Sequence, residues 1–174
     1  MSNKPQSSVS SSTTKKVHIA RFGELALEGY VNPKTYLRVD NIEFLDRTAQ
    51  MLLVPLQDTK GVYFVRDFDG DVENKQKKNF ASRPKQLGLW IRLNFRDGDM
   101  LEGVVENNML LMNDAGITIT PPEPNTFAQR VFVPRSALSD VVVVGVVGKS
   151  ARMRQQHKHA ASVAQLDLFQ QEKD

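Results

Sequence analysis

The sequence predicts an all-β protein made of two tandem small β-barrels with disordered N- and C-terminal tails. Three observations predict this fold: short segments that alternate apolar and polar residues, turn motifs between them, and two blocks of similar sequence. The chain has 174 residues, of which 40% are hydrophobic and 7% aromatic. That length suits one ordinary domain or two very small ones, and two packed barrels bury a workable core where a single one is marginal.

Changes in composition along the chain predict its division into segments. The amino-terminal segment is rich in Ser and Thr and has almost no large apolar side chains, so it cannot bury enough surface to offset its ordering entropy. A long polar stretch separates two apolar blocks, as is typical of a linker. We therefore expect a tail at 1–15, a first barrel at 16–68, a polar linker at 69–87, a second barrel at 88–148 and a basic flexible tail at 149–174.

The first block reads as a series of short strands. It begins with Val17, Ile19 and Arg21 alternating with their neighbours, a period-two pattern rich in β-forming residues. The next expected strands are short, at 43–45, 51–55 and 61–67. About five strands in some sixty residues favour a small closed barrel.

The second block repeats this pattern with a clearer turn. Residues 90–96 alternate, and Asp97-Gly98 follows at once, a strong hairpin signal because such turns need positive φ. Met100 begins the return strand, and further strands are expected at 109–112, 117–120, 130–133 and 141–147. Pro134 lacks a backbone donor, so it marks the end or edge of a strand.

Two short matches suggest that the blocks arose by tandem duplication. Leu27-Glu28-Gly29 recurs as Leu101-Glu102-Gly103, 74 residues later. An aromatic segment ending in Arg occurs at 62–66 and again at 131–135, 69 residues later. We interpret these segments as equivalent strands of two repeats, with a loop that differs by five residues.

The second block resembles the SH3/Sm-like small β-barrel, from its FRDGD turn and LEGVV strand to its late VFVPRSALSDVVVV pair. It is more similar still to an uncharacterised bacterial domain family with an FRDG…LEG…VFVPR pattern. The resemblance covers 88–148 well and 16–68 more weakly. The RNA-binding residues of Sm proteins do not match cleanly, because Asn107-Asn108 is shifted and Pro134-Arg135-Ser136 replaces the usual Arg-Gly or Lys-His. The resemblance therefore implies a fold and not a function.

Composition removes several functional classes. The chain has no Cys, which excludes a disulfide scaffold, a thiolate metal site and a cysteine nucleophile. The longest apolar run, 141–147, is too short to span a membrane, and no secretory signal is visible at the amino terminus. The three His residues lack ligand-type or acidic partners at useful spacing. We expect a cytoplasmic protein that is not an enzyme and has no cofactor or metal.

One motif near the carboxyl end points to a partner. Residues 165–169 resemble the bacterial sliding-clamp-binding pentapeptide, whose preferred form is Gln-Leu-Ser/Asp-Leu-Phe; the matching residues are Gln165, Leu166, Asp167, Leu168 and Phe169. By ordinary residue usage such a match arises in roughly one chain in a thousand. The resemblance implies that Leu168 and Phe169 fill an apolar pocket on the clamp, while the amide of Gln165 fills a polar subsite. We expect an adaptor that docks on the DNA replication clamp.

The segment before this motif is basic. Lys149, Arg152, Arg154 and Lys158 lie in it with no acid among them. They suit contacts with the DNA threaded through a clamp, which weaken as salt rises. The middle of the chain, 17–148, carries a net charge of −2.

Two alternatives stay open. Val163, Leu166 and Phe169 recur at three-residue spacing, so the tail motif also fits a short amphipathic helix docked on a barrel. The barrels also fit an Sm-like RNA- or nucleotide-binding module, in which folding gathers Arg92, Arg96, Arg130 and Arg135 into a basic patch. The sequence leaves the oligomeric state open.

Overall fold

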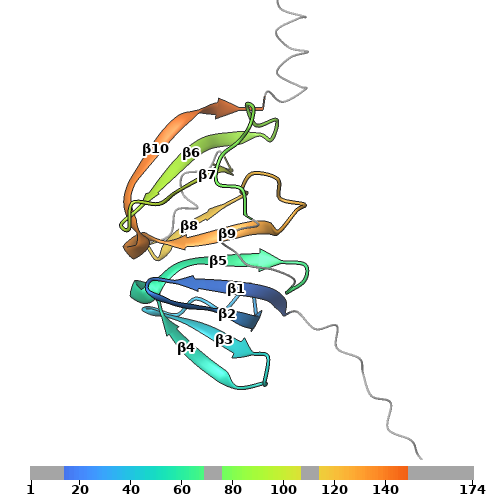
Figure 1. The fold of residues 1–174 in the computed structure, drawn as a ribbon, viewed down its shortest axis with the longest axis vertical. Coiled ribbons are helices and arrows are strands. Elements are labelled where there is room, and N and C mark those ends of the chain that lie inside the picture. Colours follow the sequence, from blue (N-terminus) through green and yellow to red (C-terminus); the bar gives the residue numbers. More distant parts are fainter. Residues whose placement is uncertain (1–13, 69–75, 107–113, 149–174) are drawn as a thin grey trace, which may run out of the picture.

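The computed structural model describes residues 14–68, 76–106 and 114–148, and in these ranges the protein is all-β (Figure 1). The first half comprises β1 (Lys15–Arg21), β2 (Glu24–Val31), β3 (Asn41–Asp46), β4 (Met51–Pro55), the 3-10 turn η1 (Leu56–Asp58) and β5 (Thr59–Val65). The second half comprises β6 (Gly88–Phe95), β7 (Met100–Val105), β8 (Gly116–Ile119), β9 (Ala128–Pro134), the 3-10 turn η3 (Arg135–Ala137) and β10 (Leu138–Val147).

The all-β prediction is confirmed, but the strands form two open sheets, and neither half closes into a barrel. A seven-stranded sheet has the order β4-β3-β2-β1-β5-β9-β8, and a three-stranded sheet has the order β10-β6-β7. An isolated bridge between Val104 and Thr120 links β7 to the end of β8. Closing each half requires its fourth strand to pair with its fifth. A proline at the end of the fourth strand and a 3-10 turn redirect the chain there, and β5 pairs with β9 of the other half instead.

The pairing of β5 with β9 joins the halves into one body. Val62 lies opposite Phe132, and Tyr63 lies opposite Val131. Each of the two junction strands also contributes to the core of the opposite half. Phe132 packs with Val17 and other first-half residues, while Tyr63 of β5 packs with the second-half core. The junction is therefore part of both hydrophobic cores.

The halves share one order of elements and one scheme of pairing. In each, the first strand pairs with the second and the fifth, and a three-residue 3-10 turn separates the fourth strand from the fifth. The segments at 62–66 and 131–135 are not equivalent, contrary to our interpretation of the repeat. The first lies in or next to β5, a fifth strand, and the second ends β9, a fourth strand. Their similar sequences lie side by side across the junction.

The repeated Leu-Glu-Gly motif has a structural explanation. A Cβ on Gly29 lies 2.2 Å from the carbonyl oxygen of Leu45 and 2.6 Å from the Phe44 ring. A Cβ on Gly103 lies 2.5 Å from the side chain of Ile119. Both distances are far below normal contact, so in each half this glycine lets the second strand cross closely over the third. The motif thus indicates a packing constraint.

Most strands of the sequence analysis are confirmed, including those at 51–55, 117–120, 130–133 and 141–147. The expected strand at 109–112, residues 1–13 of the expected amino-terminal tail and the whole expected carboxyl-terminal tail lie outside the described residues, whereas Lys15 begins β1. Part of the expected linker, residues 76–87, is described and contacts the second half. The Phe80 ring packs edge-on against Trp90, and Arg83 donates a hydrogen bond to the carbonyl of Val146 at 2.7 Å.

Candidate functional site

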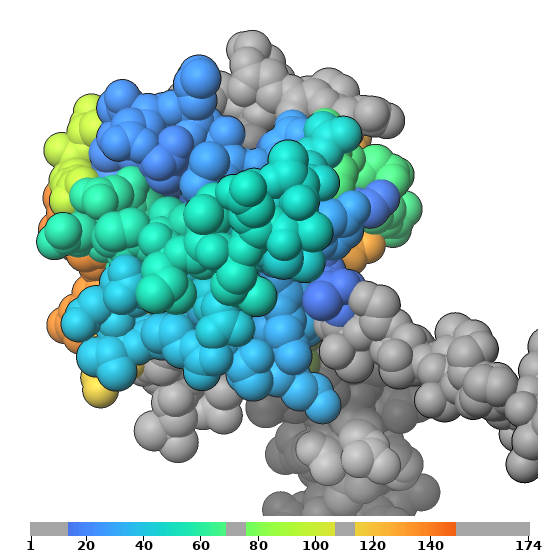
Figure 2. Space-filling model, turned by 90° about the horizontal axis from the view of Figure 1, so that it is seen from below, coloured from blue at the N-terminus to red at the C-terminus, as the bar shows by residue number. Residues whose placement is uncertain are grey.

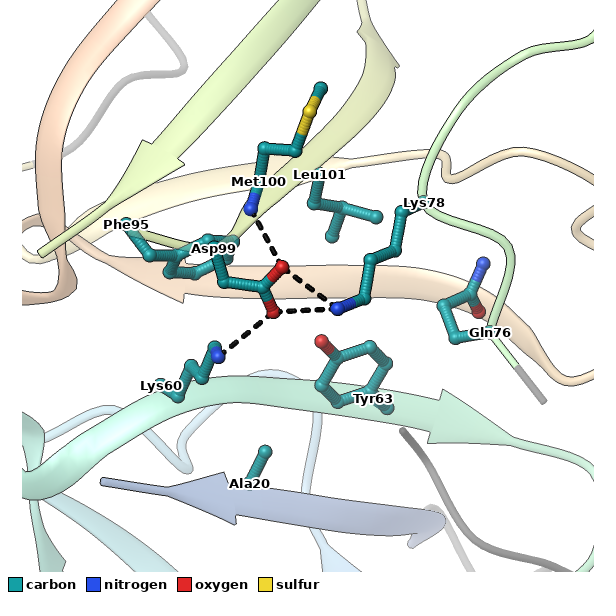
Figure 3. A pocket seen from close by; sticks show the side chains of 9 residues that line it. All are labelled: Ala20, Lys60, Tyr63, Gln76, Lys78, Phe95, Asp99, Met100 and Leu101. Carbon is teal, nitrogen blue, oxygen red and sulfur yellow. Dashed lines mark hydrogen bonds and ion pairs between the residues drawn. The ribbon is translucent and has the colours of Figure 1, made fainter. Parts of the chain in front are cut away.

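A charged cluster lies where the two halves meet (Figure 3). Lys60 of β5 forms ion pairs with Asp97 at 2.7 Å and with Asp99 at 3.0 Å, both in the β6–β7 turn. Lys78 reaches Asp99 from the other side at 2.7 Å. The ammonium of Lys60 also lies 5.9 Å from the centre of the Phe22 ring and 5.3 Å from that of Phe95, which places this cation in a partly aromatic setting.

These contacts shift the ionisation of the cluster. Partial burial by itself raises the pKa of Asp99, but hydrogen bonds from Lys78 and Lys60 outweigh burial and lower the pKa to about 2. Burial likewise opposes ionisation of Lys60, yet the hydrogen bonds that its ammonium donates to Asp97 and Asp99 raise its pKa. Lys60 and Asp99 are therefore charged at neutral pH, and the cluster brings two lysines together with two aspartates.

The cavity at this cluster is small. Its volume is about 30 Å³, and Gln76, Tyr63 and Leu101 are among its lining residues. The side-chain oxygen Oε1 of Gln76 is buried without a hydrogen-bond partner among the described residues, while its Nε2 donates to the carbonyl of Pro122 at 3.2 Å. Such a space fits about one water molecule. The charged cluster is suited to joining the two halves, and the cavity beside it is too small for an organic substrate.

A second polar site is built on the repeated Leu-Glu-Gly motif. The carboxylate of Glu102 is buried and accepts hydrogen bonds from Arg92 at 2.9 Å, from the backbone N–H of Phe80 at 3.1 Å and from the Trp90 indole at 3.3 Å. In the first half, the equivalent Glu28 pairs with Arg47 at 2.9 Å and faces His18 at 3.6 Å. Arg92 lies opposite Glu102 across β6 and β7, as His18 lies opposite Glu28 across β1 and β2.

The four predicted arginines of the body have separate surroundings. Arg92 forms an ion pair with Glu102. Arg96 donates to the carbonyl of Gln57 at 2.8 Å and lies 4.0 Å from the centre of the Phe22 ring. Arg130 is exposed on β9, and Arg135 is exposed in η3, with no ion pair to another described residue. Two of the four are thus engaged within the fold, which leaves Arg130 and Arg135 as the body's candidates for a phosphate contact.

The remaining predicted site residues lie outside the described part of the chain. These are the basic residues and the pentapeptide of the carboxyl-terminal segment, namely Lys149, Arg152, Arg154, Lys158, Gln165, Leu166, Asp167, Leu168 and Phe169. In the described ranges, no group of three potential metal-ligating side chains comes together. Within those ranges, no helix is long and apolar enough to cross a membrane.

Two edge strands expose apolar side chains that sequence reasoning did not single out. On β4, Met51 and Leu53 are 60% and 63% exposed. On β10, Val143 and Val146 are 54% and 60% exposed. The sequence carried a signal, because residues 51–54 of β4 and residues 141–147 of β10, the latter broken only by Gly145, are apolar runs without alternation, a pattern typical of strands covered on both faces.

Fold and site together define an all-β protein of two similar halves whose charged clusters hold the structure together. The chain belongs to DUF6982, a family of unknown function, whose model matches residues 13–145. The match covers both halves and stops before the carboxyl-terminal segment. Comparison with curated proteins found no match, and comparison with solved structures found none either.

Proposed function

We propose that this protein is a non-enzymatic adaptor that docks on the bacterial DNA sliding clamp through residues 165–169. The observation that carries the proposal is the pentapeptide itself, which fits the preferred clamp-binding form at every position. Leu168 and Phe169 are assigned to the apolar pocket of the clamp, the amide of Gln165 to the polar subsite, and Leu166 to the rim. Asp167 points to solvent in this assignment.

The expected affinity is modest. Burial of Leu168 and Phe169 contributes roughly 1.5–3 kcal/mol each. Ordering the peptide removes part of that gain, so the expected dissociation constant is micromolar. A clamp ring offers repeated pockets, and several copies of the adaptor at one clamp raise the apparent affinity.

The position of the motif suits this role. β10 ends at Val147, and Gln165 follows Gly148 by 17 residues. A coil of that length spans about 20–25 Å, enough for the body to sit beside a clamp. The basic residues in between, Lys149, Arg152, Arg154 and Lys158, are assigned to the phosphates of the encircled DNA. Such a partnership places the protein in the cytoplasm, at sites of replication or repair.

The body is assigned the role of a scaffold. Its charged clusters are already engaged in the fold: the buried Glu102 pairs with Arg92, and Lys60 and Lys78 pair with Asp99. The cavity at that cluster fits about one water molecule. The paired charges and the small cavity support a scaffold role for the body and not a catalytic one.

The test measures binding of the full-length protein to a purified bacterial sliding clamp by fluorescence anisotropy. We expect saturable micromolar binding that Leu168→Ala/Phe169→Ala abolishes. Asp167→Ser, which keeps the preferred form of the motif, is the matched control and should bind as tightly as the native chain. No binding at a clamp concentration of about 100 μM overturns the proposal.

The exposed arginines favour a second candidate, an RNA- or nucleotide-binding module that acts through the body. Arg130 and Arg135 have no ion pair to another described residue, and both belong to the segment from β9 to η3. This candidate predicts that Arg130→Gln/Arg135→Gln lowers affinity for single-stranded RNA, while Leu168→Ala/Phe169→Ala leaves it unchanged. The reverse result favours the clamp adaptor.

A further inference from the structure

The chain leaves two strand edges unpaired, at opposite ends of the molecule. β4 ends the seven-stranded sheet and β10 ends the three-stranded sheet, while the other two end strands, β8 and β7, are linked to each other by the bridge between Thr120 and Val104 (Figure 1). β4 and β10 are the fourth strand of the first half and the fifth strand of the second half. Their counterparts, β9 and β5, are the two strands that pair with each other inside the chain. The junction pairs the fifth strand of one half with the fourth strand of the other. The two free edges are again a fifth and a fourth strand, so they are complementary in the same way.

Burial separates paired from unpaired strands in the same way. β5 is almost entirely buried, whereas β10 exposes Val142, Val143, Val144 and Val146. β9 is largely buried, whereas β4 exposes Met51, Leu52 and Leu53. Figure 2 looks at the end that carries β3 and β4, where the described surface comes mainly from the first half. Soluble proteins usually protect such edges with Lys, Pro or a bulge. The apolar run of β10 contains neither Lys nor Pro, and the register of its pairing with β6 shifts only after Val143, between Val143 and Gly145.

We propose that copies of this protein assemble head to tail, with β10 of one copy pairing antiparallel with β4 of the next. The occupant of each free edge is a second copy, because the junction inside the chain already shows the pair of strands that fit. The inference is independent of the proposed clamp binding.

The internal junction also gives the register. Counted from the proline that ends the fourth strand, Leu53 corresponds to Phe132 and Val141 corresponds to Val62. Since Val62 lies opposite Phe132, Val141 of one copy lies opposite Leu53 of the next. The neighbouring pairs follow in step and are all apolar: Val142 with Leu52, and Val143 with Met51.

The surface beside β10 has room for the incoming strand. A hollow of about 300 Å³ opens there, with Ile117, Leu138 and Val141 among its lining residues. In the first half, Phe132 packs in one cluster with Ile42 and Val62, the counterparts of Ile117 and Val141. Leu53 of a second copy is thus expected to contact Ile117 and Val141 as Phe132 contacts its own cluster. Pairing of unlike edges forms a ring if the rotation closes and a filament if it does not.

The first experiment measures molar mass by size-exclusion chromatography with light scattering over 1–100 μM full-length protein. We expect species above the 19.6 kDa monomer that grow with concentration. Val143→Lys blocks β10, and Met51→Lys blocks β4, so each variant alone should be a monomer. An equimolar mixture should give a dimer and nothing larger, since one intact edge of each kind remains.

Controls separate a lost contact from a lost fold. Circular dichroism and thermal melting should show each variant folded like the native chain. Leu25→Lys adds the same charge at an exposed apolar position on β2, which has partners on both sides, and should leave assembly intact. Val142→Cys and Leu52→Cys, placed in separate copies of this cysteine-free chain, should cross-link on mild oxidation. Val142→Cys with Leu25→Cys should not.

Several outcomes overturn the proposal. A native chain that stays monomeric at 100 μM shows that no second copy covers the edges, whether they are free or occupied by another segment of the same chain. Val143→Lys that still dimerises indicates pairing of β4 with β4, and Met51→Lys that still dimerises indicates pairing of β10 with β10. Assembly lost in Leu25→Lys places the contact on another surface.

Discussion

The two halves of this protein have the same strand order but differ in what covers their edge strands. The fifth strand of the first half is buried because β9 pairs with it, and the fifth strand of the second half is exposed. The fourth strands show the opposite: β9 is largely buried and β4 is mostly exposed. Side chains at equivalent positions of the two halves are therefore expected to contribute differently to the free energy of unfolding. The contribution depends on whether their strand is paired on both sides. Substitutions at matched positions measure this difference.

The largest effect is expected at Phe132. This side chain is fully buried in the core of the first half, where its ring packs edge-on against Tyr36 at 5.9 Å between ring centres. Phe132→Ala should lower the free energy of unfolding by about 3–5 kcal/mol, since it removes a large buried ring and leaves a cavity. Chemical denaturation of dilute protein measures it.

The matched substitution is Leu53→Ala, at the equivalent position of the unpaired strand. Leu53 is largely exposed in the single chain, so the change should stay within about 0.5 kcal/mol at a concentration where copies do not associate. Equal losses for the two variants would mean that the junction does not distinguish the halves.

The sequence predicted the all-β class and most strands because alternation and turn residues are local signals. Asp97-Gly98 marked the β6–β7 turn, and Gly98 indeed has positive φ. The sequence did not predict which edges would pair, since pairing depends on contacts between residues far apart in the chain. Residues 62–66 and 131–135 are similar in sequence and lie in or next to two strands that pair with each other. The sequence comparison wrongly interpreted them as equivalent strands of the two repeats.

The candidate sites were less predictable for the same reason. Arg92 and Arg96 read as surface cations in the sequence, but Glu102 and the carbonyl of Gln57 engage them in the fold. The charged cluster brings together residues that are far apart in the chain, namely Lys60, Lys78 and Asp99, so no local sequence pattern predicts it. The pentapeptide at 165–169 is the opposite case, a contiguous motif visible only in the sequence.

An intermediate effect is expected at the glutamate of the Leu-Glu-Gly motif. Glu102 is buried and accepts hydrogen bonds from three groups, so Glu102→Ala leaves several donors without their partner. The expected loss is about 2 kcal/mol in the free energy of unfolding. Glu28→Ala, at the equivalent site, removes a partly exposed pair with Arg47 and should cost under about 1 kcal/mol.

Urea denaturation of both variants under the same conditions gives the comparison. We expect burial to determine how much this carboxylate stabilises the fold. A loss of unfolding free energy in Glu28→Ala as large as that in Glu102→Ala would contradict this expectation. Glu102→Gln is a useful companion, because it keeps the size and the acceptor oxygen but removes the charge. It should recover part of the stability lost in Glu102→Ala.

An effect smaller than that at Glu102 is expected at the charged cluster of the junction, which the first half does not repeat. The β1–β2 turn has Phe22 and Gly23 where the β6–β7 turn carries Asp97 and Asp99. The folded state lowers the pKa of Asp99 to about 2, below its unfolded value of about 3.9. Asp99 therefore stabilises the fold above pH 4, and this contribution disappears as the pH falls toward 2.

Asp99→Asn should accordingly lower the free energy of unfolding by about 1 kcal/mol at pH 7, a figure reduced by the partial exposure of the group. The difference between native and variant protein should shrink steadily between pH 5 and pH 2, as thermal melts across that range can show. Asp114→Asn, at an exposed carboxyl group with no ion pair to another described residue, is the control that removes the same charge away from the cluster. A gap at Asp99 that stays constant with pH would mean that the cluster acts through packing, and the junction would then owe its stability to the β5–β9 core alone.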